Sequence, residues 1–348
     1  MTYVPKWKGT VEYVEESVFG TLPAPATMVW PGIVTSAKPT QKPKVESKFY
    51  LRPDPITTGA AATSDGISGA RKHFKVGEEI GLDLEIVPQA GGLQSLIRYA
   101  HGGYAAYANL VTDSLKSMSW AMKNQAGTGT NIFNVYKGCV MREIAITIPE
   151  DNVVTAKIGL DAIEATSSST SYLVAGAHAA ESSAAALTSG SMAQIGSGQY
   201  IAMRKSAASP TAWSSSVNLA DAVKSLELRI TNKLTRVKDL NSTNSTKTKG
   251  FVVNSRDYIL ALELNYDDIS VATADNKFSL TDIRSLTPFD VQFAIDGYKY
   301  TITGVRWPEL PYEWGGDDLL GDKLTSLPAT GYIESAAWVP AFGVVVNT

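Results

Sequence analysis

The sequence predicts a mainly β protein with two tandem β-sandwich or barrel domains, and three observations carry this prediction. Short runs in which apolar and polar residues alternate recur through much of the chain, as expected of strands with one buried face. Two of these runs form the arms of hairpins with unusually long polar loops, one hairpin in each half of the chain. Proline-rich segments lie near both ends, and proline at that density disfavours helix interiors and central strands. We therefore expect two strand-rich domains between extended N- and C-terminal arms.

The clearest strand pattern lies in residues 224–268. In its first arm Leu226, Leu228 and Ile230 alternate with charged residues, and residues 258–265 repeat that period in a second arm. The residues between the arms are rich in Lys, Asn, Ser and Thr. A loop of that length is uncommon in a compact domain unless it contacts another element or is disordered.

The first half follows the same order of elements. Residues 45–52 and 80–86 predict two strands around a loop at 53–76 that is rich in Pro, Gly, Ser and Thr. Residues 92–101 then place apolar side chains at helical spacing, and Gly102 is suited to end the helix. We therefore expect one short packed helix in the first domain.

Each half closes with a pattern typical of a tight hairpin. Residues 131–148 predict one with its turn near Lys137–Gly138, and residues 153–163 continue as a further strand. In the second half, residues 288–305 predict a hairpin whose two-residue turn is Asp296–Gly297. The shared order of elements indicates an internal duplication with little residue identity.

Composition shifts set the expected domain boundaries. After residue 165 the chain becomes rich in Ala, Ser and Gly, which is typical of a linker. We expect an N-terminal arm over 1–34, a first β domain over 35–165, a linker over 166–216 with a short strand at 201–204, a second β domain over 217–330 and a C-terminal arm over 331–348.

Composition and charge exclude several classes of protein. The chain has 348 residues, of which 44% are hydrophobic, so it can bury a sizeable core. Its 31 Lys and Arg against 34 Asp and Glu argue against tight binding to nucleic acid, though not against transient contact with DNA. A single cysteine, Cys139, rules out an intramolecular disulfide framework. We expect neither a signal peptide nor a membrane-spanning segment.

No motif for catalysis or metal binding stands out. His73, His101 and His178 have no metal-ligand spacing, and neither the serine-hydrolase elbow nor the phosphate-binding loop motif occurs. The acidic pairs at 267–268 and 317–318 are more simply solvated charges than calcium ligands. We therefore expect no enzyme activity, no cofactor and no metal site.

Four segments, however, carry a resemblance to a known family. WKGTVEYVEESVFGTLPAP from Trp7, VKSLELRITNKL from Val223, RDYILALEL from Arg256 and YKGCVMREIAITI from Tyr136 are similar to the tail tube proteins of long-tailed bacteriophages, their major tail proteins. The resemblance is one of pattern and element order. It implies a β-sandwich or barrel with one packed helix, and subunits that form stacked rings around a channel for DNA. Most members have one such domain and form hexamers. With two domains in this chain, we expect a pseudo-hexameric trimer, with a hexamer as the alternative.

The resemblance also implies roles for three sets of residues. A basic channel lining would hold DNA, because each phosphate that it neutralises adds affinity, whereas a neutral to acidic lining would let DNA slide. The alternative to a channel lining is that the charged sides of these strands are simply solvated. The lumen candidates are Asp83, Glu85, Glu227 and Glu263. The candidates for contact with the next ring are Arg236, Lys238, Asp239, Lys247 and Lys249. The candidates for apolar burial by the terminal arms are Trp7, Phe19, Trp30, Trp338 and Phe342.

These inferences favour a structural function. The expected partners are further copies of the chain, other tail proteins such as the tape measure and terminator proteins, and double-stranded DNA in transit, without a membrane. The expected location is the virion tail, with host cytoplasm before assembly. The main alternative is a surface or adhesion module of tandem β-sandwiches, which would explain the Ser/Thr-rich linker, and the third is a soluble enzyme with an unrecognised site.

Overall fold

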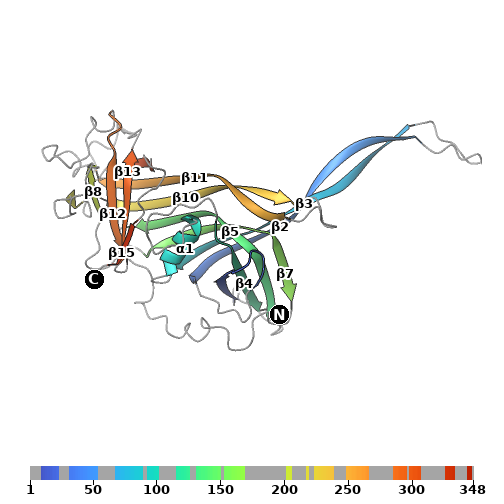
Figure 1. Ribbon diagram of the computed structural model, residues 1–348, viewed down its shortest axis with the longest axis horizontal. Helices are drawn as coiled ribbons and strands as arrows, with labels where there is room; N and C mark the ends of the chain where they lie inside the picture. Colours follow the sequence, from blue (N-terminus) through green and yellow to red (C-terminus); the bar gives the residue numbers. More distant parts are fainter. Residues whose placement is uncertain are drawn as a thin grey trace, which may run out of the picture.

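A computed structural model gives the architecture of the chain and is mainly β, with its strands arranged as in a β-sandwich (Figure 1). It describes residues 9–22, 31–53, 67–88, 92–101, 115–125, 131–149, 153–168, 201–205, 217–218, 223–238, 248–265, 285–295, 298–306, 326–333 and 343–346.

One helix and fifteen strands make up the described elements. In the first half these are β1 (Gly9–Glu15), β2 (Gly32–Pro53), β3 (Ile67–Pro88), α1 (Gly92–His101), β4 (Met118–Gln125), β5 (Asn131–Pro149), β6 (Thr155–Ala162) and β7 (Glu164–Ser168). In the second half they are β8 (Ile201–Lys205), β9 (Val217–Asn218), β10 (Val223–Lys238), β11 (Thr248–Asn265), β12 (Phe289–Ile295), β13 (Tyr298–Arg306), β14 (Ser326–Ile333) and β15 (Gly343–Val346).

The strands form one long antiparallel sheet and a smaller one that share β5. The long sheet runs in the order β2-β3-β6-β5-β10-β11-β14-β13-β12-β8-β9. The smaller sheet joins β1, β4, the first part of β5 and β7. Residues 143–149 of β5 pair with residues 225–231 of β10, so this ladder joins the two halves of the chain.

Strand β5 changes sheet at Gly138, where the sequence suggested a hairpin turn. Lys137 still pairs with Glu164 of β7, whereas Val140 pairs with Asp161 of β6. The φ of Gly138 is 58°, a left-handed conformation that glycine adopts readily. The predicted hairpin at 131–148 is therefore wrong: the glycine turns a corner between two sheets and the strand continues.

The core lies between the two sheets. From the smaller sheet, Tyr13 and Trp120 stack with ring centroids 4.8 Å apart. They belong to the same buried cluster as Ile86 of β3 and Leu96 of α1. This helix lies in the segment where the sequence predicts one, and its packing side faces β5 and β10. The buried cluster continues into the second half, for example at Phe289.

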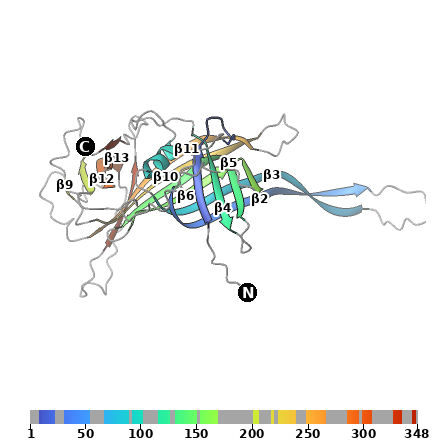
Figure 2. The same cartoon turned by 90° about the horizontal axis from the view of Figure 1, so that it is seen from below.

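The hairpin of β2 and β3 is much longer than the sequence suggested. These strands pair from Gly32–Pro88 to Pro53–Ile67, so Pro53 and residues 67–76 of the predicted loop at 53–76 are strand. Because β6 pairs only with residues 80–86 of β3, the outer part of the hairpin projects from the body (Figures 1 and 2). Its dozen residues per strand span about 40 Å at about 3.3 Å each. Pro39 and Pro43 fit within β2 because it is an edge strand, where proline is tolerated.

Other predicted elements have mixed outcomes. The hairpin with its turn at Asp296–Gly297 is confirmed, since Ile295 pairs with Tyr298, and the short strand at 201–204 is β8. Part of the predicted N-terminal arm is β1, a strand paired along its length with β4. The predicted loop between β10 and β11 is shorter than expected, because pairing reaches Lys238 and Thr248.

The second half of the chain has its own set of pairings. Strand β8 pairs with β12, β10 with β11, β11 with β14, and β13 with β12, β14 and β15. In Figure 1, β8, β12, β13 and β15 lie at the end of the molecule opposite the projecting hairpin. Strands β10 and β11 run between this end and the body.

Candidate functional site

The most distinctive surface is the polar side of the sheet formed by β2, β3, β6, β5, β10 and β11, named the charged face here. Residues that pair across antiparallel strands share one side of a sheet. One such row contains Lys38, Asp83, Gly159, Glu143, Thr231 and Asp257. The next row contains Ser36, Glu85, Lys157, Ala145, Arg229 and Ile259.

Three of the four predicted lumen positions fall on this one face. Asp83 and Glu85 belong to the two rows above, and Glu227 pairs with Thr147 in the row that follows them. The fourth position, Glu263, pairs in register with Ser225 of β10. The sheet thus brings together, from both halves of the chain, residues that the sequence selected separately.

The opposite side of the same strands is apolar and buried. Leu82 and Leu84 of β3, Ile144 and Ile146 of β5, and Leu228 of β10 are each at most 3% exposed. A sheet with one buried and one charged side explains the strict alternation in the sequence.

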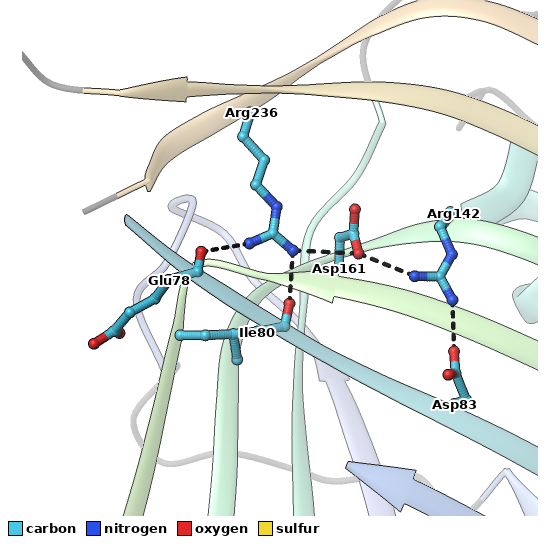
Figure 3. Close-up of polar contacts among 6 residues, drawn as sticks. All are labelled: Glu78, Ile80, Asp83, Arg142, Asp161 and Arg236. Carbon is cyan, nitrogen blue, oxygen red and sulfur yellow. Dashed lines mark hydrogen bonds and ion pairs between the residues drawn. The ribbon is translucent and has the colours of Figure 1, made fainter. Parts of the chain in front are cut away.

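Ion pairs connect the strands of the charged face (Figure 3). The Arg142 guanidinium lies 2.6 Å from the Asp83 carboxylate and 3.3 Å from that of Asp161. Asp161 also lies 3.4 Å from the Arg236 guanidinium. These four side chains link β3, β5, β6 and β10, and each charge faces an opposite one.

Further pairs lie on β5, β10 and β11. Arg229 lies 2.7 Å from Glu227 and 3.5 Å from Glu143, and Lys233 lies 2.9 Å from Asp257. All these groups are well exposed, so each pair contributes only about 0 to 1 kcal/mol to stability. Their effect on the surface is larger, because they leave it with charges of both signs in close alternation.

Arg236 holds the outer part of β10 against β3. Its guanidinium donates hydrogen bonds to the carbonyl oxygens of Glu78 and Ile80, at 2.8 and 3.0 Å. The Lys238 ammonium donates to the carbonyl oxygen of Val76 in the same strand. These carbonyls lie where β6 ends, so the β10 side chains act in place of a neighbouring strand. The contacts seen for Arg236 and Lys238 are thus within the chain, and their role between rings stays a prediction.

The remaining predicted contact residues divide between described and undescribed parts. Lys249 is an exposed residue of β11, while Asp239 and Lys247 lie outside the described residues. Phe19, 38% exposed, packs edge-on against Phe251 with ring centroids 6.4 Å apart. Four arm candidates lie outside the described residues: Trp7, Trp30, Trp338 and Phe342.

A buried carboxylate supports the corner of β5. Glu16, 4% exposed, accepts hydrogen bonds from the Gly138 N–H at 2.8 Å, the Ser119 hydroxyl at 2.5 Å and the Gly20 N–H at 2.7 Å. Cys139 follows the corner and is fully buried, and this burial raises the pKa of its thiol. Both groups are enclosed within the fold and serve its geometry.

Sequence reasoning missed Arg142, Asp161 and Glu16. Arg142 interrupts the alternation of β5 because it occupies a bulge between Met141 and Glu143. Only long-range strand pairing brings Asp161 and Glu16 to their partners, so no local signal could have revealed them.

Among the described residues, no group of three or more His, Cys, Asp and Glu side chains is arranged to hold a metal ion. No helix in the described ranges is long and apolar enough to cross a membrane. No protein-family model matches the chain, and no curated protein is significantly similar to it in sequence.

Proposed function

We propose that the chain is a structural subunit of a phage tail tube, in which two copies of one β domain per chain build stacked rings around a channel for DNA. The observation that carries this proposal is the charged face, a continuous polar surface to which both halves of the chain contribute. A ring of such sheets would enclose a polar channel.

The pairing pattern supports two copies of one domain. Six pairings in the first half have counterparts in the second half, in the same order along the chain. The first set is β1·β4, β2·β3, β3·β6, β4·β5, β5·β6 and β5·β7. The second set is β8·β12, β10·β11, β11·β14, β12·β13, β13·β14 and β13·β15.

Irregularities in the strands match as well, and they are more specific than strand order. The register of β2 with β3 shifts between Val34 and Ser36, and that of β10 with β11 shifts between Val223 and Ser225. A second shift lies eight residues further on in each, after Lys44 and after Lys233. Bulges are retained features of a fold, so their agreement in two hairpins supports a common origin.

The corner glycine recurs too. Gly304 of β13 has a φ of 72° and lies where this strand leaves β15 for β14, as Gly138 lies where β5 leaves β7 for β6. The carboxylate of Asp290 accepts a hydrogen bond from the Gly304 N–H at 3.3 Å, matching the role of Glu16. Both carboxylates are 4% exposed.

The alternating charges of the charged face suit passing DNA. A basic lining would bind phosphates and release counterions, giving tight, salt-dependent affinity. Here the arginines of the face, Arg142 and Arg229, lie beside carboxylates, which reduces the positive charge that they present to phosphates. DNA would move past such a surface without being held.

The projecting β2–β3 hairpin provides a contact along the tube axis. Its outer part extends about 40 Å at the rise of a strand, enough to reach a neighbouring ring. With two domains per chain, three subunits supply six domains per ring, so we favour a trimer over a hexamer. Tape measure and terminator proteins are the proposed partners at the tube ends, and the virion tail the proposed location.

Electron microscopy of the purified full chain tests the proposal. After concentration, negatively stained samples are expected to show rings or hollow tubes, and native mass spectrometry of single rings is expected to give three copies. A stable monomer at all salt concentrations would contradict the tube function and favour a surface module of tandem sandwiches.

A further inference from the structure

The outer edge of β2 stands out as a strand side without a neighbour. Among the described strands, β2 pairs only with β3. From Lys38 to Glu46 all side chains except the half-buried Thr40 are exposed, including those on the side of the strand that faces the core elsewhere. An edge strand of this length exposes backbone groups that another chain can pair with.

The β10–β11 hairpin, the counterpart of the β2–β3 hairpin, shows which strand covers the corresponding edge. The matching register shifts make Lys233 of β10 the counterpart of Lys44 of β2, so Thr231 corresponds to Lys42 and Leu228 to Pro39. At these positions β10 is covered by β5, and Leu228 and Ile230 are fully buried. The same place on β2 is open.

The counterpart of the covering strand follows from the corner glycines. Glu143, which pairs with Thr231, comes five residues after Gly138. The residue five positions after Gly304 is Glu309. Residues 309–315, ELPYEWG, therefore correspond to residues 143–149 of β5.

We propose that the edge of β2 at Ser36–Lys42 pairs antiparallel with residues 309–315 of a second copy of this chain, as β10 pairs with β5 within one copy. The inference rests on the proposed function and names the contact that closes its ring. Each chain has one such edge and one such segment, so the contact is heterologous and repeats around an axis.

Charge complementarity supports this register. The pairing sets Lys42 opposite Glu309 and Lys38 opposite Glu313, so both lysines of the ladder meet a glutamate. The segment also alternates, with Leu310, Tyr312 and Trp314 at the positions of three buried isoleucines of β5. Pro308 corresponds to Arg142, a bulge position where proline is tolerated.

The composition of the edge also selects against wrong partners. Two β2 edges facing each other would bring lysines together, and Pro39 and Pro43 remove donors that an unrelated strand would use. A strand with glutamates opposite Lys38 and Lys42 is accepted, because carbonyl acceptors and the remaining N–H groups still pair.

Cysteine cross-linking tests the register in the full chain. In a Cys139→Ala background, Gln41→Cys with Leu310→Cys places thiols at the positions of Ile230 and Ile144, which are directly paired. Paired residues lie about 4.5 to 5.5 Å apart, within disulfide range. Oxidation is expected to yield covalent multimers on a non-reducing gel. The off-register control, Ala37→Cys with Leu310→Cys, is expected to leave monomers.

Charge reversal tests the contact in assembly. Lys38→Glu with Lys42→Glu is expected to abolish rings, as is Glu309→Lys with Glu313→Lys, while all four changes in one chain restore them. Glu164→Lys, on strand β7 of the smaller sheet, is the control and is expected to leave ring formation unchanged.

The outcomes separate the ladder from the function. If rings form without the 41–310 cross-link, or if the cross-link forms within one chain, the proposed pairing of Ser36–Lys42 with residues 309–315 is wrong and the tube function is unaffected. Cross-linked multimers without rings or tubes support the ladder and contradict the function. A monomer without cross-links contradicts both.

Discussion

The carboxylate of Glu16 accepts a hydrogen bond from the backbone N–H of Gly138 at 2.8 Å. This contact joins the end of β1 to the corner of β5. The Ser119 hydroxyl and the Gly20 N–H complete the set of donors around the same carboxylate. Donors of this kind replace the water that a buried charge gives up, so the site is stable only while acceptor and donors are all present.

Truncating Glu16 is therefore expected to destabilise the fold. Glu16→Ala leaves buried N–H and hydroxyl donors unpaired, at a cost of about 2 to 4 kcal/mol in the free energy of unfolding. The measurement is urea unfolding of the full chain. The neighbouring exposed Ser17→Ala is the control, expected within about 0.5 kcal/mol of the parent; equal effects of the two would show that the carboxylate does not support the corner.

The corner itself requires glycine. A Cβ on Gly138 would lie 2.5 Å from Cγ1 of Ile163, and the φ of 58° strains any L side chain. We expect Gly138→Ala to lower the free energy of unfolding by about 1 to 3 kcal/mol. Gly250→Ala is the matched control, since a Cβ there has nothing within 4 Å. Unchanged stability of Gly138→Ala would refute the corner geometry.

Local patterns predicted much of the fold correctly. Period-two alternation marked the paired parts of β3, β6, β10 and β11, because these strands have one buried and one charged side. The Asp296–Gly297 turn was confirmed, since a two-residue loop fixes a reversal. Gly138 also marked a turn of the chain, but local sequence does not distinguish a reversal from a corner. The contact with Glu16, far away in the chain, decides between them.

The limits of the sequence reasoning lie in long-range pairing. Pro53 suggested the start of a loop, although an edge strand accommodates it. Asp83, Glu85 and Glu227 could be chosen from alternation alone, whereas Arg142 and Asp161 meet only through the pairing of β5 with β6. Likewise β1 was taken as part of an arm, because its pairing with β4 spans about a hundred residues of sequence.

Arg236 is expected to stabilise the outer part of the second hairpin. Arg236→Lys keeps the charge but loses the forked donation to Glu78 and Ile80, which we expect to cost about 1 to 2 kcal/mol. Hydrogen exchange of residues 233–238 should rise in this variant. Lys233→Ala, which removes an exposed pair with Asp257, is the control and is expected to cost below about 1 kcal/mol. If exchange near Arg236 were unaltered, the anchoring role would be wrong.

Stability is expected to fall at alkaline pH because of Tyr99. Burial, and then the nearby Glu15 carboxylate that accepts its hydroxyl at 3.1 Å, raise the pKa of Tyr99 above its ordinary value of 10.0. Above about pH 10 the unfolded chain releases this proton while the folded chain retains it, so stability is present below that pH and is lost as pH rises.

The effect is measurable by urea unfolding between about pH 9 and about pH 11. Each tyrosine with a raised pKa contributes up to about 1.4 kcal/mol per pH unit above its ordinary value. Tyr99→Phe should reduce the slope of the free energy of unfolding against pH. Tyr136 and Tyr258, whose pKa values burial also raises, should maintain part of this slope. A slope identical in Tyr99→Phe would exclude Tyr99 as its source.

The charged face is expected to keep DNA from binding, and adding positive charge there should reverse this. Glu85→Lys with Glu227→Lys adds positive charge on two strands of the charged face and removes the carboxylate that lies 2.7 Å from Arg229. The assembled variant should bind double-stranded DNA with a salt dependence that steepens by about 0.9 in log–log slope for each new phosphate contact. Glu164→Lys on the smaller sheet adds charge outside the charged face and is the control. Fluorescence anisotropy of labelled DNA measures both. Because only a lumen position confines DNA against these side chains, equal binding by the two variants would mean that the charged face faces outward and that another surface lines the channel.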